Sequence, residues 1–156
     1  MRIRLLGVKN RMPLKLPPRV KVLEALGCVA DGRVRIVSDS EAEITSSVGD
    51  RVYNVRLDLN TRRVFSNDNG TLYRNYVGYP IISFLMVKGI LPYDERVANA
   101  LRGINWRKVN EEFKNYSLVE TYIKDLLKAK GIEESYVDRL IEDVLSKLKT
   151  LSLSKM

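Results

Sequence analysis

The stretch from Pro80 to Lys88 constrains the fold more than any other part of the chain. Its proline stands in the first turn of an expected helix, where the missing N–H is harmless, and Gly89 follows the last helical residue. The side chains that point in all directions around this helix are apolar: Ile81, Ile82, Phe84, Leu85, Met86 and Val87. A helix that is hydrophobic on every side has to be buried, so we expect the rest of the chain to pack around it.

The chain before this helix predicts strands. Val52–Leu59 alternates apolar and polar residues, which is typical of a strand with one buried face. β-branched residues predict further strands at Arg33–Val37, Ala42–Thr45 and Val64–Phe65, separated by turn-forming residues. We therefore expect an antiparallel meander of about four strands packed on the central helix.

The remaining segments predict helices. They are Arg19–Leu26, ended by Gly27, and then Asp94–Arg102, Asn105–Lys114, Ser117–Lys130 and Ser135–Thr150, the last two opened by capping-box spacing. The expected fold class is α+β, with a small antiparallel β-meander packed on a buried helix and followed by a C-terminal helical bundle. We divide the chain into a basic arm or edge strand at 1–18, a meander-plus-helix unit at 19–90, and a helical region at 91–156 that packs on the same core.

Composition excludes several functional classes. The 156 residues include no His and one Cys, which removes histidine-based nucleophilic catalysis, histidine-containing zinc sites and any internal disulfide. Cys28 is expected to be a buried core residue in a reducing compartment. Without a secretory signal or an apolar run long enough to span a membrane, the chain is expected to be cytoplasmic and to make no membrane contact. Its highly charged composition without Gln resembles that of heat-adapted proteins.

The acidic residues do not predict catalysis or metal binding. Neighbouring acids on a helix point about 100° apart, and Asp94 and Glu133 stand at helix starts, where the helix dipole favours them. Asp58 and Asp68 lie in turn-forming clusters that lack the spacing of an EF-hand. We expect no catalytic residue, no bound metal and no cofactor.

The net charge of +8 is concentrated at the N-terminus. The basic residues that precede the first acid, Glu24, are Arg2, Arg4, Lys9, Arg11, Lys15, Arg19 and Lys21. Because prolines break this segment, it cannot form a long helix, and we expect an arm that binds the phosphate backbone of a nucleic acid. The alternative is a solubilising terminus that packs through its apolar residues.

Aromatic residues alternate with cations at two further places. The first cluster holds Tyr73, Arg74, Tyr76 and Tyr79, and the second holds Trp106, Arg107 and Lys108. Single-stranded nucleic acids are bound by stacking of bases on aromatic rings beside cations, so both clusters are candidate contacts. The alternative is that the rings pack in the core with their polar atoms facing water.

The segment Val22–Lys88 resembles a SWIM-type zinc finger. Ala42–Gly49 and Tyr53–Leu57 match the strands of that module, and Pro80–Met86 matches its helix. The resemblance implies a module that binds DNA or protein partners, including partners of recombination proteins.

The metal ligands of a SWIM module are not present. Its Cys-x-Cys pair falls on Phe65 and Asn67, and its Cys-x-His pair falls on Gly78 and Pro80. The resemblance therefore implies a metal-free version, in which aromatic packing and Pro80 would hold the strand end against the helix start in place of zinc.

The last expected helix carries a wide apolar stripe that continues to Leu151. We interpret the stripe as an interface for a second copy or another protein, with Ile141, Val144, Leu145, Leu148 and Leu151 as candidate contacts. The alternative is packing within the chain, on the preceding helix or on the meander.

These patterns together predict a non-enzymatic nucleic-acid-associated binding protein, for which the SWIM resemblance suggests an accessory role in DNA recombination or repair. The alternative is a protein–protein adaptor or homo-oligomeric scaffold that acts through its C-terminal helices.

Overall fold

A computed structural model describes residues 12–156. Six strands form one sheet in the order β1-β6-β5-β4-β3-β2. Their bounds are β1 Met12–Pro13, β2 Val34–Ser38, β3 Glu41–Thr45, β4 Val52–Asp58, β5 Arg63–Ser66 and β6 Ser154–Lys155. All neighbours are antiparallel except β5 and β6, which run parallel. Strands β2 to β5 are the predicted meander.

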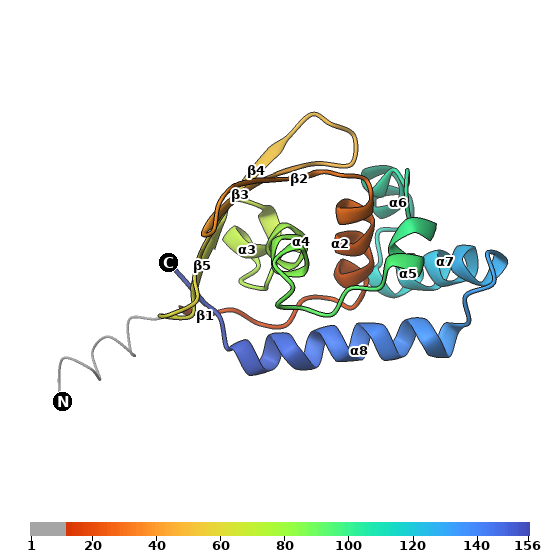
Figure 1. Ribbon diagram of the computed structural model, residues 1–156. Coiled ribbons are helices and arrows are strands. Elements are labelled where there is room, and N and C mark those ends of the chain that lie inside the picture. The colour runs from red at the N-terminus through yellow and green to blue at the C-terminus, as the bar shows by residue number, and fades with distance from the viewer. Residues whose placement is uncertain (1–11) are drawn as a thin grey trace.

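The helices lie on one side of this sheet (Figure 1). Their bounds are α2 Val20–Ala30, α3 Asn69–Tyr73, α4 Tyr79–Val87, α5 Glu95–Ala100, α6 Trp106–Phe113, α7 Tyr116–Ala129 and α8 Glu134–Leu151. Helices α3 and α4 lie nearest the sheet, α2 follows, and α5, α6 and α7 form the far end of the molecule, while α8 runs from that end back toward the sheet. The α+β class is confirmed.

Helix α4 is the centre of the core, as its sequence predicts. Ile81, Ile82, Phe84 and Leu85 have no exposed surface. One side of α4 packs on strands β2, β4 and β5, and another packs on α2. The sheet residues that face it are Ala42, Ile44, Val55, Leu57 and Val64, all buried.

Helix α2 does not end at Gly27, as its sequence suggests. It continues to Ala30 and turns at Gly32, where φ is +70°. A Cβ atom at Gly27 would lie 3.2 Å from the carbonyl oxygen of Leu101 and 3.3 Å from the indole nitrogen of Trp106. Glycine is therefore at this position because the C-terminal helices pack closely on α2.

The expected capping boxes at Ser117 and Ser135 are wrong. Asn115 caps α7 instead, because its side-chain oxygen accepts a hydrogen bond of 3.1 Å from the backbone N–H of Leu118. At the start of α8 the N-cap residue is Glu133, and no side chain bonds a backbone N–H there.

The apolar stripe of α8 packs within the chain. Ile141, Val144 and Leu148 are at most 3% exposed, and Leu145 and Leu151 are partly buried against the same core. The chain after α8 adds β6 to the sheet between β1 and β5, which carries the apolar end of the stripe onto the meander. Of the five residues that the sequence assigned to a protein interface, the monomer therefore buries three and covers Leu145 and Leu151 in part.

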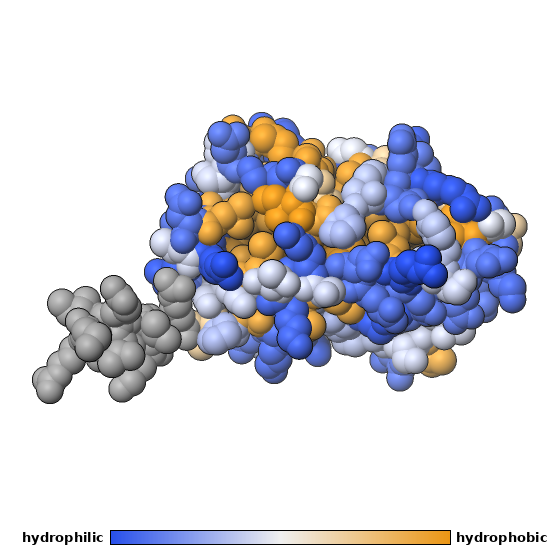
Figure 2. Space-filling view, turned by 60° about the horizontal axis from the view of Figure 1, so that its bottom comes forward, coloured by the Kyte–Doolittle hydropathy of each residue, from blue (hydrophilic) through white to orange (hydrophobic). Residues whose placement is uncertain are grey.

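Hydrophobic and hydrophilic side chains occupy different parts of the surface of the described residues. On the face shown in Figure 2, hydrophobic side chains gather in the middle, and hydrophilic side chains dominate the end that holds α7. Within residues 12–156, no helix is both long and apolar enough to cross a membrane.

Two substitutions in α4 test its central position. Leu85→Ala removes a side chain without exposed surface and is expected to lower the free energy of unfolding by about 2–5 kcal/mol. Val87→Ala, in the same helix but 44% exposed, is expected to cost less than about 1 kcal/mol. Urea denaturation of both variants measures the difference, and equal costs would contradict the central placement of α4.

Candidate functional site

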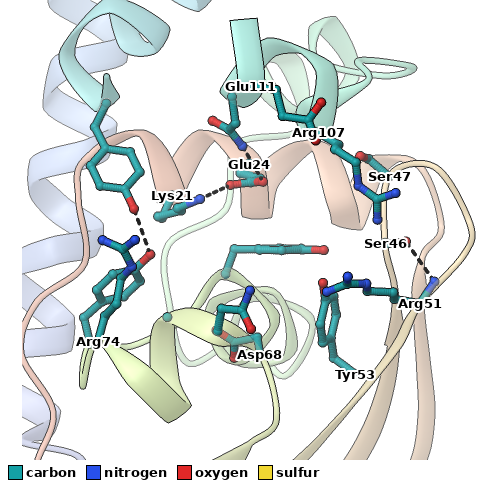
Figure 3. Close-up of a pocket in the computed structure, with 16 residues that line it drawn as sticks. Lys21, Glu24, Ser46, Ser47, Arg51, Tyr53, Asp68, Arg74, Arg107 and Glu111 are labelled. Atoms are coloured by element: carbon teal, nitrogen blue, oxygen red, sulfur yellow. Dashed lines mark hydrogen bonds and ion pairs between the residues drawn. The ribbon is translucent and has the colours of Figure 1, made fainter. Parts of the chain in front are cut away.

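A cavity of about 330 Å³ opens where several parts of the chain meet. Helix α2, the turn between β3 and β4, the α3 region and helix α6 form most of its wall, and β4, α4 and α7 each add one tyrosine. Figure 3 shows Lys21 and Glu24 reaching into it from α2, with Asp68 on the opposite side. In the same view Arg74 lies at one end, and Arg51 and Arg107 lie at the other.

A buried ion pair crosses the top of the cavity. The Lys21 ammonium donates to the Glu24 carboxylate at 2.9 Å, and both side chains are less than 15% exposed. Burial lowers the pKa of Lys21, but the interaction with Glu24 outweighs it, so that the net pKa lies above the usual value for lysine. Asn110 of α6 donates to the same carboxylate at 3.5 Å. Lys21 therefore keeps its charge at neutral pH.

Four tyrosines form the aromatic part of the wall. The rings of Tyr53 and Tyr79 meet edge to face, with centroids 6.1 Å apart. The hydroxyls of Tyr76 and Tyr116 lie 3.4 Å apart. Burial raises the pKa of Tyr79, and the nearby Glu24 carboxylate adds to this effect. Burial also raises the pKa of Tyr76, with a further contribution from Tyr116. Both residues are neutral phenols at physiological pH.

The floor of the cavity depends on the carboxylate of Asp68. It caps α3 by accepting from the Thr71 backbone N–H at 3.1 Å, and it also accepts from the hydroxyls of Thr71 and Ser66. A Cβ atom at Gly78 would lie 2.1 Å from this carboxylate, and one at Gly70 would lie 2.4 Å from the ring of Tyr76. These two glycines allow the α3 loop to pack tightly enough to form the floor.

An ion pair holds one rim of the cavity. Arg107 of α6 donates two hydrogen bonds of 2.7 Å to Asp50 in the turn between β3 and β4. The hydrogen bonds from Arg107 lower the pKa of Asp50 to about 2. Ser46 ties the turn further, because its hydroxyl bonds both the Asp50 carboxylate and the backbone N–H of Arg51.

Two arginines of the wall have no acidic partner among the described residues. Arg51 and Arg74 are both exposed, and neither side chain makes an ion pair or a hydrogen bond within residues 12–156. They lie at opposite ends of the cavity. These two cations are therefore available to an anionic ligand.

Five of the residues that the sequence predicts as nucleic-acid contacts line this cavity, although they come from distant parts of the chain. They are Lys21, Arg74, Tyr76, Tyr79 and Arg107. Of these, Lys21 and Arg107 are already paired with carboxylates of the protein.

The other nominated residues lie elsewhere. Trp106 is 1% exposed in the core, which corrects the expectation that it stacks on a base. Arg19 binds Glu120 and Asp138 and so joins α2 to α7 and α8, instead of serving as a free cation.

Tyr73 is 76% exposed on α3, and Lys108 and Lys15 are exposed, but none of the three lines the cavity. Arg2, Arg4, Lys9 and Arg11 fall outside the residues that the structure describes.

Several wall residues were not nominated from the sequence. Glu24 follows Lys21 by three residues, a spacing that favours an ion pair on one helix, and this pattern could have indicated it. Arg51, Asn110 and Tyr116 stand alone in their segments, and no pattern in the sequence indicates that they meet. Among residues 12–156, no three His, Cys, Asp or Glu side chains lie close enough to hold a metal ion.

Comparison with known proteins assigns the chain to a family. The model of the uncharacterised conserved protein family UCP014422 matches residues 14–154, so the chain belongs to that family. No SWIM domain is indicated, which corrects the resemblance drawn over Val22–Lys88; a meander followed by a buried helix is a pattern that many small α+β domains share. The link to recombination proteins depended on that resemblance and is withdrawn with it. No curated protein and no solved structure matches the chain.

The contact between Asp68 and Gly78 can be tested by a double-mutant cycle. Gly78 has φ −70° and ψ 160°, which any residue can adopt, and the three atoms nearest to a Cβ at this position all belong to the Asp68 carboxylate, so Gly78→Ala acts through a clash with Asp68. We expect it to lower the free energy of unfolding by about 1–3 kcal/mol. In the double variant with Asp68→Ala the clash is absent. The loss of unfolding free energy in the double variant should therefore be smaller than the sum of the losses in the two single variants. Strict additivity in urea denaturation would contradict this contact.

The Arg107–Asp50 pair predicts a pH dependence. Because the folded-state pKa of Asp50 is about 2 and the usual value is 3.8, the pair stabilises the fold above about pH 4 and loses this contribution as the pH falls toward 2. An NMR titration of the Asp50 carboxyl carbon measures the midpoint directly. We expect Arg107→Ala to move it toward 3.8, and a wild-type midpoint already near 3.8 would show that the pair is not formed in solution.

Proposed function

We propose that this member of the UCP014422 family binds single-stranded nucleic acid by taking one unpaired base into the cavity between α2 and α6. The observation that supports this most directly is the convergence of tyrosines with two unpaired arginines in one concave site. Aromatic rings beside free cations are the chemistry that binds single strands with little dependence on sequence.

The size of the cavity favours a single nucleotide unit. Its volume of about 330 Å³ is at the lower end of the range of about 300–1,000 Å³ found for small-molecule sites. A base can enter such a cavity only after it leaves its helix, at a cost of a few kcal/mol in a duplex. The proposal therefore includes a preference for single strands over duplexes.

The charges of the site separate into two groups. Lys21 and Arg107 are each paired with a carboxylate, so they hold the wall and contribute little net charge. Arg51 and Arg74 are unpaired at opposite ends. A nucleotide within a strand carries one phosphate on each side, and one arginine at each end of the cavity matches that arrangement.

The carboxylates of the site support binding more than catalysis. Glu24 is paired with Lys21, and the Asp68 carboxylate accepts from three donors in capping α3. Both carboxylates are thus used within the protein, and the third carboxylate of the wall, Glu111, is exposed on α6. We therefore propose a binding protein and not an enzyme.

Fluorescence titration with labelled single- and double-stranded oligonucleotides tests the proposal. We expect the single strand to bind more tightly, and Tyr116→Ala to weaken it by about 5- to 150-fold, the equivalent of about 1–3 kcal/mol for one stacked base. Arg74→Ala should also reduce the slope of log K against log salt by about 0.7, the value for one phosphate contact on a single strand.

Lys147→Ala is the matched control for Arg74→Ala. Lys147 is exposed on α8, carries the same charge and does not line the cavity. A loss of affinity equal to that of Arg74→Ala would show that the contacts are diffuse and not in the cavity, and no binding by the wild type at low salt would reject the proposal.

A further inference from the structure

A second cavity of about 310 Å³ adjoins the first. The two share four wall residues: Lys21, Arg74, Asn110 and Tyr116. The second cavity lies toward the junction of α6 and α7, where Lys114, Asn115 and Val119 complete its wall. A ligand bound in the first cavity can therefore extend past Arg74 and Tyr116 into the second.

The two cavities differ in charge. The wall of the first cavity has four cations and three carboxylates, and the carboxylates are Glu24, Asp68 and Glu111. The second has three cations, Lys21, Arg74 and Lys114, and its wall contains no carboxylate. Lys21 is neutralised by Glu24, but Arg74 and Lys114 have no acidic partner among the described residues. With two such cations, two asparagines and no carboxylate in the wall, an anionic group is favoured there over a neutral one.

The backbone at Lys114 supports a role for its side chain. Lys114 caps α6 in the left-handed region, with φ 52° and ψ 20°. This conformation is one that glycine adopts freely and that a lysine adopts only with strain. The end of α6 favours a cation, but the left-handed backbone does not favour lysine. The side chain is exposed and makes no ion pair or side-chain hydrogen bond among the described residues, so its ammonium is available to a ligand.

We propose that the second cavity binds the phosphate of the nucleotide whose base occupies the first. This inference rests on the proposed function and adds a direction to it: the base lies among the four tyrosines of the first cavity, Tyr53, Tyr76, Tyr79 and Tyr116, and the phosphate lies between Arg74 and Lys114. The protein would then bind a nucleoside monophosphate much more tightly than the nucleoside that lacks the phosphate.

Isothermal titration calorimetry with adenosine, adenosine 5′-monophosphate, the uridine pair and inorganic phosphate tests this. We expect each monophosphate to bind at least tenfold more tightly than its nucleoside, with inorganic phosphate weaker than either monophosphate. Lys114→Gly should remove most of that difference without changing nucleoside affinity. Since glycine suits the left-handed backbone at this position, the variant should keep the thermal stability of the wild type. Arg74→Ala should act in the same direction, and Lys147→Ala should leave every affinity unchanged.

The outcomes separate the two proposals. Equal affinities for nucleoside and monophosphate, or an equal loss of both in Lys114→Gly, would overturn the phosphate site and leave the base-binding cavity standing. Phosphate binding that depends on Lys114, without any gain from a nucleoside, would support the anion site and contradict the proposed base contact. If none of these compounds and no oligonucleotide binds, both proposals fail.

Discussion

The carboxylate of Asp68, packed against Gly78, is the contact on which the rest of the site depends. It joins the end of β5, the start of α3 and the start of α4, because Ser66, Thr71 and Gly78 all surround it. A buried carboxylate is costly unless each of its lone pairs is satisfied, and here three donors supply that compensation. With α3 fixed in this way, Arg74 and Tyr76 are held at one end of the cavity.

The structure uses its charges in two distinct ways. Arg19 and Lys124 bind the acids of α7 and α8, and Lys21 and Arg107 bind acids around the cavity, so these cations stabilise the arrangement of helices. Arg51, Arg74 and Lys114 have no such partners within residues 12–156. A protein whose net charge is +8 thus neutralises many of its cations internally and leaves three of them around two adjoining cavities.

Much of the fold follows from local patterns in the sequence. Helix α4 is predicted because apolar side chains surround it, and the meander is predicted because Val52–Asp58 alternates. Helix α3 is not, because Asn69 and Gly70 are poor helix formers, and it forms through the Asp68 cap and packing on Tyr76. Strand β6 depends on where α8 ends in space, which no local pattern specifies.

The candidate site could be predicted only in part, because its residues come from distant positions and local patterns do not show which of them converge. Four residues of the two clusters in which tyrosine or tryptophan alternates with cations line one cavity, together with Lys21 of the N-terminal basic segment. Sequence spacing cannot show that positions 21 and 107 converge, nor that Trp106 points into the core while its neighbour Arg107 points out. The acids that pair with Arg19 lie more than a hundred residues away in the sequence. No local pattern could therefore show that Arg19 is not a free cation.

The eight tyrosines of the chain allow the most direct test of where a nucleic acid binds. In a sample with ¹³C-labelled tyrosine rings, NMR spectra recorded during addition of a single-stranded oligonucleotide report on every ring at once. We predict shifts and intermolecular contacts to base protons at Tyr53, Tyr76, Tyr79 and Tyr116, which line the cavity. Shifts confined to Tyr93, Tyr122 and Tyr136, which lie outside it, would contradict the account.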